Sequence, residues 1–147
     1  MKSWLNKVKR LPADKIDRSK YLRPDKNEIV KKFEKKFLNY IKKNVNTFNL
    51  SSYPNINNVK NKIAKKIGVK KEMIFISAGS DLSLKTCFEL FTKPKDRAII
   101  LEPTFGMVDV YCGIYNIKPI KVGYDKNLKL NYSKINKNIS KKISLII

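Results

Sequence analysis

From residue 73 onward, short apolar runs alternate with segments whose apolar residues recur at helical spacing. The apolar runs are of strand length and predict strands at residues 74–77, 98–101, 117–122 and 143–147. Helical patterns separate these runs, starting at Asp81, near residues 107–115 and around residues 132–139. Alternation of this kind predicts an α/β fold, in which helices flank the faces of an open, mostly parallel sheet.

The first 72 residues are predicted to form an N-terminal arm and helices, distinct from the α/β part at residues 73–147. Asp25 and Glu28 have the spacing of a capping box, which predicts that a helix opens there. Its apolar positions line one face, namely Ile29, Val30, Phe33, Phe37, Tyr40 and Ile41. A second helix is expected to end at Gly68, because glycine readily adopts the left-handed conformation that closes a helix.

The turn between the first predicted strand and its helix is the clearest candidate binding site. It reads Ser77-Ala78-Gly79-Ser80-Asp81, with Ser77 expected to end the strand and Asp81 to lie in the first helical turn. The N-terminus of a helix has unpaired N–H groups and the positive end of the helix dipole, which together attract anions such as phosphate. We therefore expect the N–H groups of Gly79, Ser80 and Asp81 to face one point.

A flat ring is predicted close to that turn. Phe105 follows the strand at residues 98–101, within Glu102-Pro103-Thr104-Phe105-Gly106, and should lie on the same sheet edge as Gly79. A phosphate site beside a flat ring suits a flat, phosphorylated cofactor. Taken one at a time, the same residues have simpler interpretations: Asp81 as a helix cap and Phe105 as a core aromatic.

The formal net charge of +21 raises the alternative of a basic module that binds nucleic acid or another polyanion. The charge is uneven, since residues 1–72 hold 21 Lys and Arg against 6 Asp and Glu. Most of these lysines lie on the polar side of helical patterns, which favours solvated helix faces over a nucleic-acid surface. Strong, salt-dependent retention on nucleic acid would distinguish the basic module.

Several classes of site find no support in the sequence. Histidine is absent, and Cys87 and Cys112 have neither metal nor redox spacing, so no metal site is expected. No Gly-x-Gly-x-x-Gly follows a strand, which ranks a Rossmann-like nucleotide-binding domain last. The opening Met1-Lys2-Ser3-Trp4 is unlike a signal peptide and no apolar run is of membrane-spanning length, so we expect a cytoplasmic location and no membrane partner.

Four segments, taken in order, resemble a known family. They are Tyr53-Pro54, Ile67-Gly68-Val69, residues 74–81 and Glu102-Pro103-Thr104-Phe105-Gly106-Met107. The stretch Asp25-Lys26-Asn27-Glu28 and the pair Val110-Tyr111 also match. This series is similar to the N-terminal portion of histidinol-phosphate aminotransferases, which are class I/II (fold-type I) enzymes dependent on pyridoxal 5′-phosphate. The resemblance implies part of the large domain of such a transferase, preceded by a helical arm. It also implies amino-group transfer between an amino acid and a 2-oxo or phosphorylated carbonyl substrate, by a homodimeric full-length protein.

The resemblance assigns roles to seven residues. The cofactor-binding residues are Gly79, Ser80, Asp81, Phe105 and Tyr53, and the substrate-binding residues are Asn27 and Glu28. The Gly-Ser-Asp turn would hold the cofactor phosphate, and the phenylalanine would stack on the pyridine ring in place of the family's usual tyrosine. The tyrosine would reach across a dimer interface to the phosphate bound by the other subunit.

The catalytic groups that the resemblance implies are missing from these 147 residues. They are the lysine that forms a Schiff base with the cofactor, the aspartate and tyrosine that contact its ring, and the arginine that binds the substrate carboxylate. An Asn-Pro-x-Asn-Pro-Thr-Gly segment is expected directly after Ile147, where the sequence stops inside a strand pattern. We therefore expect the chain to be the front part of a longer protein, and inactive alone.

Overall fold

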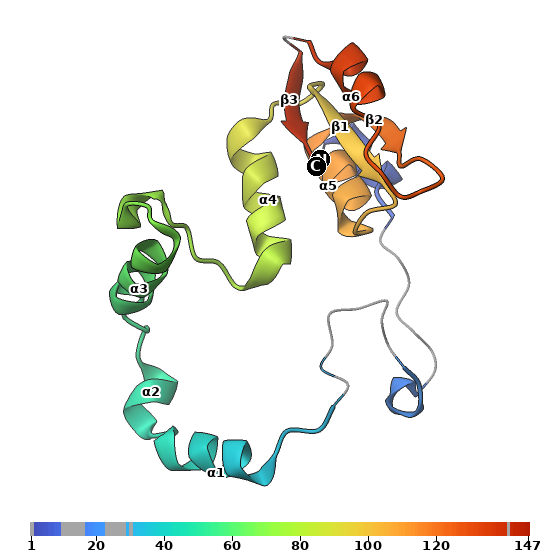
Figure 1. Cartoon of the computed structure of the whole chain (residues 1–147). Helices are drawn as coiled ribbons and strands as arrows, with labels where there is room; N and C mark the ends of the chain where they lie inside the picture. Colours follow the sequence, from blue (N-terminus) through green and yellow to red (C-terminus); the bar gives the residue numbers. More distant parts are fainter. Residues whose placement is uncertain (1, 10–16, 23–28, 30, 141) are drawn as a thin grey trace. The chain divides into compact units, whose positions relative to one another are not determined.

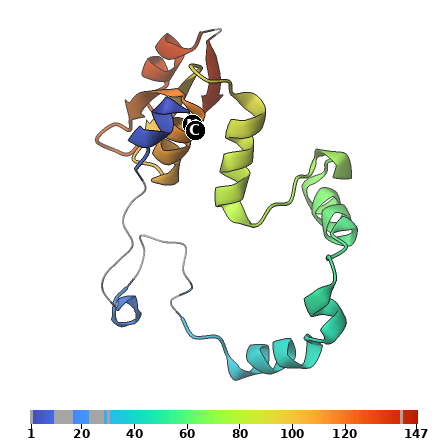
Figure 2. The ribbon, with the colours of Figure 1, turned by 180° about the vertical axis from the view of Figure 1, so that it is seen from behind.

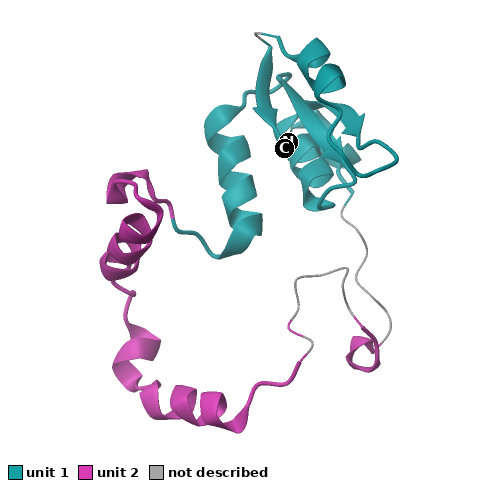
Figure 3. Cartoon of the chain, viewed as in Figure 1, with its two compact units in different colours: residues 1–12, 76–147 teal, residues 13–75 magenta. Residues whose placement is uncertain are grey.

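The computed structural model describes residues 2–9, 17–22, 29, 31–140 and 142–147. The chain divides into two compact units, distinguished by colour in Figure 3. Unit 1 comprises residues 1–12 together with 76–147, and unit 2 comprises residues 13–75. Each unit has its own secondary structure and is described separately.

The described residues of unit 1 include a three-stranded parallel sheet. Its strands are β1 (Arg97–Glu102), β2 (Lys118–Gly123) and β3 (Ile143–Ile146), in the spatial order β2-β1-β3. The central strand β1 therefore bonds to a neighbour on each side, with Ile99 opposite Ile120 of β2 and opposite Ile146 of β3. The prediction of a parallel α/β sheet is confirmed, as are its strands near residues 98–101, 117–122 and 143–147.

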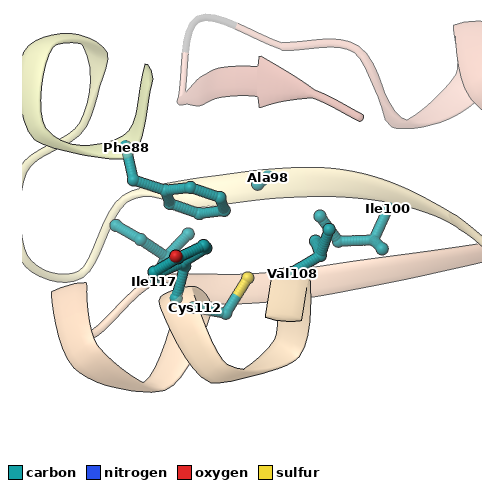
Figure 4. Close-up of a cluster of buried hydrophobic side chains, with 7 residues drawn as sticks. Phe88, Ala98, Ile100, Val108, Cys112 and Ile117 are labelled. Atoms are coloured by element: carbon teal, nitrogen blue, oxygen red, sulfur yellow. The ribbon is translucent and has the colours of Figure 1, made fainter. Parts of the chain in front are cut away.

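Helices cover both faces of this sheet. They are α4 (Gly79–Phe91) and α5 (Met107–Tyr115) on one face and α6 (Tyr132–Asn138) on the other. Figure 4 shows the first core cluster, which comprises Phe88, Ala98, Ile100, Val108, Tyr111, Cys112 and Ile117. The second cluster comprises Ile99, Val122 and Ile135. Since neighbouring residues of β1 enter opposite clusters and are fully buried, the central strand reads as a continuous apolar run.

The first residues of the chain pack against α5. A 3₁₀ helix, η1 (Ser3–Lys7), places the indole Nε1 of Trp4 so that it donates to the carbonyl oxygen of Ile114 at 3.1 Å. Val8 lies so close to Gly113 that a Cβ added there would stand 3.0 Å from its Cγ2. Glycine at this position allows the N-terminal segment to approach the helix backbone, a contact that the weak periodicity of the arm did not predict.

Unit 2 consists of short helices with little buried surface among its described residues. They are η2 (Arg18–Lys20), α1 (Lys35–Asn44), α2 (Thr47–Ser51), α3 (Asn57–Ile67) and η3 (Lys71–Met73). The prediction for the end of the second helix is confirmed, since Gly68 caps α3 with a φ of 73°. Ala64 is the buried hydrophobic residue in the described part of this unit.

The first helix of unit 2 starts later than predicted. Asp25 and Glu28, which form the capping-box pattern, lie outside the described residues, but residues 29 and 31–34 are not helical and α1 begins at Lys35. Its apolar side chains remain exposed, with Phe37 at 44% and Ile41 at 40%. Short helices depend on packing of their apolar face, and without that packing nothing supports additional N-terminal turns.

Residues 74–77 have no regular secondary structure and form no ladder with another strand among the described residues, so the prediction of a strand there is wrong. An extended segment becomes a strand only when a neighbour takes up its N–H and C=O groups, and Phe75 remains 66% exposed. None of the described helices combines the length and apolar sequence needed to cross a membrane.

Candidate functional site

The carboxyl edge of the sheet is where the topology favours ligand binding. After β1 the chain passes through α5 to β2 on one side, and then through α6 to β3 on the other. The strand order therefore reverses at β1, and ligands of open α/β sheets bind beyond the strands' carboxyl ends at such a point. The start of α4 and the loop at residues 103–106 both lie at this edge (Figures 1 and 2). The loop lies there because it follows β1 directly, and the start of α4 lies there because α4 precedes β1 and runs opposite to it.

The turn that leads into α4 depends on Gly79. Its φ of +87° lies in the left-handed region, and an added Cβ would have no atom within 4 Å. The turn is closed by the N–H of Gly79, which donates to the carbonyl oxygen of Ser77 at 2.8 Å, and by the Ser77 hydroxyl, which donates to the Gly79 carbonyl oxygen at 2.9 Å. The expectation that the Gly79 N–H faces an anion is therefore wrong, because this donor is used inside the turn.

The N–H groups of Ser80 and Asp81, in the first turn of α4, are not used inside the turn as the N–H of Gly79 is. Within the described part of the chain they donate no hydrogen bond, and Ala78 at the N-cap provides no side-chain acceptor. Asp81 lies in the first turn, as predicted. Two free donors at the positive end of a 13-residue helix form a small cradle with the chemistry to accept a phosphate.

Tyr111 is part of the sequence resemblance, but no role at this site was predicted for it. Its hydroxyl donates to Oδ1 of Asp81 at 2.7 Å, which connects α5 to the first turn of α4. The signal was present, because Val108, Tyr111, Cys112 and Tyr115 are spaced as one face of a helix. A tyrosine on a buried face has a hydroxyl that must find a partner, so this pattern predicts a polar contact on a neighbouring element.

Phe105 lies beyond the carboxyl end of β1, as predicted. Its side chain is 52% exposed, so it is not a core aromatic. Its carbonyl oxygen accepts a hydrogen bond at 3.0 Å from the N–H of Val108, which connects the loop to the first turn of α5. An aromatic ring held on a short loop, with about half of its surface free, can stack on a planar ligand.

An ion-pair cluster holds both ends of this loop. Nζ of Lys121 lies 2.5 Å from Oε1 of Glu102, the last residue of β1, and 3.2 Å from Oδ2 of Asp109 in the first turn of α5. The hydrogen bond to Glu102, followed by that to Asp109, raises the pKa of Lys121. The lysine therefore stays charged and links the residues before and after the loop.

The remaining predicted residues belong to unit 2. Tyr53 belongs to unit 2, between α2 and α3, and its side chain is fully exposed. Asn27 and Glu28 lie outside the described residues. Within the described residues of unit 1, the α4 turn and Phe105 share the carboxyl edge. No group of His, Cys, Asp or Glu that could hold a metal ion occurs in the described ranges.

A family model and curated relatives both indicate an aminotransferase family. The family model described as "Aminotransferase class I and II" matches residues 17–147. Histidinol-phosphate aminotransferase of Christiangramia forsetii is 34% identical over 106 residues, covering 70% of this chain and 30% of that protein. The enzyme of the same name from Pelagibacter ubique is 30% identical over 99 residues, covering 66% and 27%. The chain thus spans less than a third of these relatives.

Solved structures agree at the level of the fold. Bna3p of Saccharomyces cerevisiae, described as a putative kynurenine aminotransferase, aligns with a TM-score of 0.54 at 15% identity, over 62% of this chain and 25% of its own. Cystalysin from Treponema denticola, whose structure is described as containing pyridoxal 5′-phosphate, aligns with a TM-score of 0.53 at 18% identity, over 68% and 27%. At these identities the likeness concerns the fold.

Proposed function

The chain belongs to the class I and II aminotransferase family, and we propose that its carboxyl edge is the phosphate-binding and ring-stacking part of a pyridoxal 5′-phosphate site. The single observation that carries the proposal is the pair of free N–H donors at the start of α4, on the sheet edge that also carries Phe105. Because both features fit a flat, phosphorylated ring, the residues present suit this cofactor.

Each residue has a defined task in this proposal. The N–H groups of Ser80 and Asp81 donate to phosphate oxygens, and Gly79 shapes the turn that presents them. The exposed ring of Phe105 stacks on the pyridine ring and keeps its orientation. When bound, pyridoxal 5′-phosphate supplies an electron sink that allows an amino group to move between an amino acid and a carbonyl substrate.

The other assignments come from the family resemblance and are part of the proposal. Tyr53 would donate its hydroxyl to the phosphate held by a second copy of the chain, and its complete exposure leaves it available for that contact. Asn27 and Glu28 would lie near the substrate. The protein would act as a cytoplasmic homodimer. The relatives' names point to histidinol phosphate, or to the phosphorylated carbonyl compound that corresponds to it, as a substrate.

We expect no transamination by these 147 residues alone, because no lysine here occupies a position that the family resemblance links to covalent cofactor binding. The test is turnover with an amino donor and a 2-oxo acid, after removal of host transaminases. Turnover that one lysine substitution abolishes would contradict the assignment. Because no turnover is expected, ligand binding is a better measure than activity for this part of the site.

The binding experiment uses pyridoxine 5′-phosphate, which has the ring and phosphate but no aldehyde, and so cannot react with the chain's many lysines. Calorimetry at about 0.3 M salt suppresses weak attraction to the basic surface. We expect pyridoxine 5′-phosphate to bind about tenfold or more tightly than pyridoxine, which lacks the phosphate. Equal binding of the two compounds would refute the phosphate site. Displacement of pyridoxine 5′-phosphate by a short DNA duplex would also refute it and would favour a polyanion-binding module.

Two pairs of variants assign the binding to named groups. Ser80→Pro removes one N–H while proline remains acceptable in a first helical turn, and Ser80→Ala is its matched control. We expect only the proline variant to lose affinity, by about tenfold. Phe105→Ala should weaken binding much more than Phe105→Tyr. Equal losses in the second pair would indicate a packing role for Phe105.

A further inference from the structure

Tyr111 connects the core of unit 1 to the first turn of α4. Its side chain is 5% exposed, and its ring centroid lies 5.8 Å from that of Phe88. At the other end, its hydroxyl donates to Oδ1 of Asp81 at 2.7 Å and lies 3.4 Å from the Asp81 carbonyl oxygen. Core packing thus fixes where the hydroxyl is, and the hydroxyl in turn determines where the Asp81 carboxylate lies.

The Asp81 carboxylate has two opposing effects at this position. Negative charge in the first turn stabilises a helix, because it faces the positive end of the dipole. The same charge repels a phosphate that approaches the N–H groups of that turn. An acidic side chain at the third helical position can also fold back onto the N-cap N–H and so occupy the helix end. In α4 no such cap forms, and the carboxylate is bonded to Tyr111 instead.

We infer that Tyr111 is a positioning residue, which holds the Asp81 carboxylate against α5 and thereby keeps the first-turn N–H groups of α4 open to a phosphate. This inference rests on the proposed phosphate site and adds a residue to which the family comparison gave no role. Tyr111 does not touch the ligand. It acts through the direction of one carboxylate, so its effect requires the charge of Asp81.

The chain offers a matched pair of hydroxyl deletions on one helix. Tyr111→Phe removes the bond to Asp81 and retains the ring. Tyr115→Phe removes an equivalent bond, from the Tyr115 hydroxyl to Oε1 of Glu89 at 2.7 Å, which does not involve the first turn of α4. We expect Tyr111→Phe to raise the Kd for pyridoxine 5′-phosphate about tenfold, and Tyr115→Phe to change it less than about twofold. Pyridoxine, without a phosphate, should bind both variants as it binds the wild type.

A double-mutant cycle separates positioning from general stability. Asp81→Asn removes the charge but keeps an oxygen that can accept from Tyr111. If the hydroxyl acts by directing a negative charge, Tyr111→Phe should lose most of its effect in the Asp81→Asn background. An equal loss in both backgrounds would overturn the inference, because the hydroxyl would then be acting through the fold alone.

The outcomes distinguish this inference from the proposed function. If the wild-type chain binds pyridoxine 5′-phosphate no better than pyridoxine, the phosphate site itself is refuted. If the wild type binds selectively and Tyr111→Phe binds equally well, the site stands and the positioning role is refuted. Circular dichroism and urea unfolding of each variant confirm that the binding constants are compared between folded proteins.

Discussion

Replacing Gly79 with alanine tests how the turn before α4 is stabilised. Because an added Cβ meets no atom within 4 Å, the substitution introduces no collision, and its cost is that of placing an L-residue at a φ of +87°. That cost is ~1–2 kcal/mol. Alanine also lowers the conformational entropy of the unfolded chain, which stabilises the folded state by ~0.4–1 kcal/mol. The expected net destabilisation of unit 1 is therefore ~1 kcal/mol.

Gly123 provides the matched control. It also has open space around its added Cβ, but its φ is not in the left-handed region, so Gly123→Ala should be neutral or slightly stabilising. Urea unfolding can be followed through Trp4, the chain's single tryptophan, which is bonded to α5 within unit 1. If the two alanine variants unfold at the same urea concentration, backbone strain at Gly79 does not shape the turn. A strained turn should also rotate its N–H groups, so Gly79→Ala should bind pyridoxine 5′-phosphate more weakly than Gly123→Ala.

Three further predictions concern the rest of unit 1. Phe88 is fully buried, so Phe88→Ala should destabilise the unit by ~3–5 kcal/mol in urea unfolding, and a loss below ~1 kcal/mol would contradict the packing described above. Hydrogen bonds from Ser144 and from the Lys93 backbone lower the pKa of Asp96 in the folded chain. They therefore stabilise the fold at pH values above the pKa of Asp96 in the unfolded chain, and this stabilisation is lost as the pH falls through its pKa in the folded chain. The difference in stability between Ser144→Ala and wild type should therefore shrink as the pH falls below the ordinary aspartate pKa of about 3.9, and a constant difference would refute the linkage. Burial raises the pKa of Cys112 to about 11, so its alkylation at pH 8 should be slow in the folded chain and fast in urea.

The α/β part was predictable from sequence because its signals are local. Strands such as residues 98–101 are continuous apolar runs. Within α5 and within α6 the apolar residues recur at helical spacing. The resemblance to class I and II aminotransferases, carried by residues 74–81 and 102–107, is confirmed by the family match. The cofactor, substrate and dimer roles of individual residues stay predictions.

The expectations that were wrong depend on partners that a single sequence does not reveal. Residues 74–77 have the composition of a strand, but strand formation needs a neighbour. The helical pattern also includes Ile29 and Phe33, but these residues are not helical and α1 begins at Lys35. The use of the Gly79 N–H inside its own turn follows from a backbone angle, and side-chain patterns do not encode such angles directly.

The central position of β1 affects how this sheet can assemble during synthesis. β1 bonds to β2 and to β3, yet about forty residues separate its end from the start of β3. A ribosome adds ~5–20 residues per second, so one edge of the most apolar strand waits seconds for its partner. During that interval the backbone of Ala98, Ile99 and Ile100 can pair with another growing chain. Pairing of β3 with β1 therefore determines whether this edge is covered or stays open to another chain.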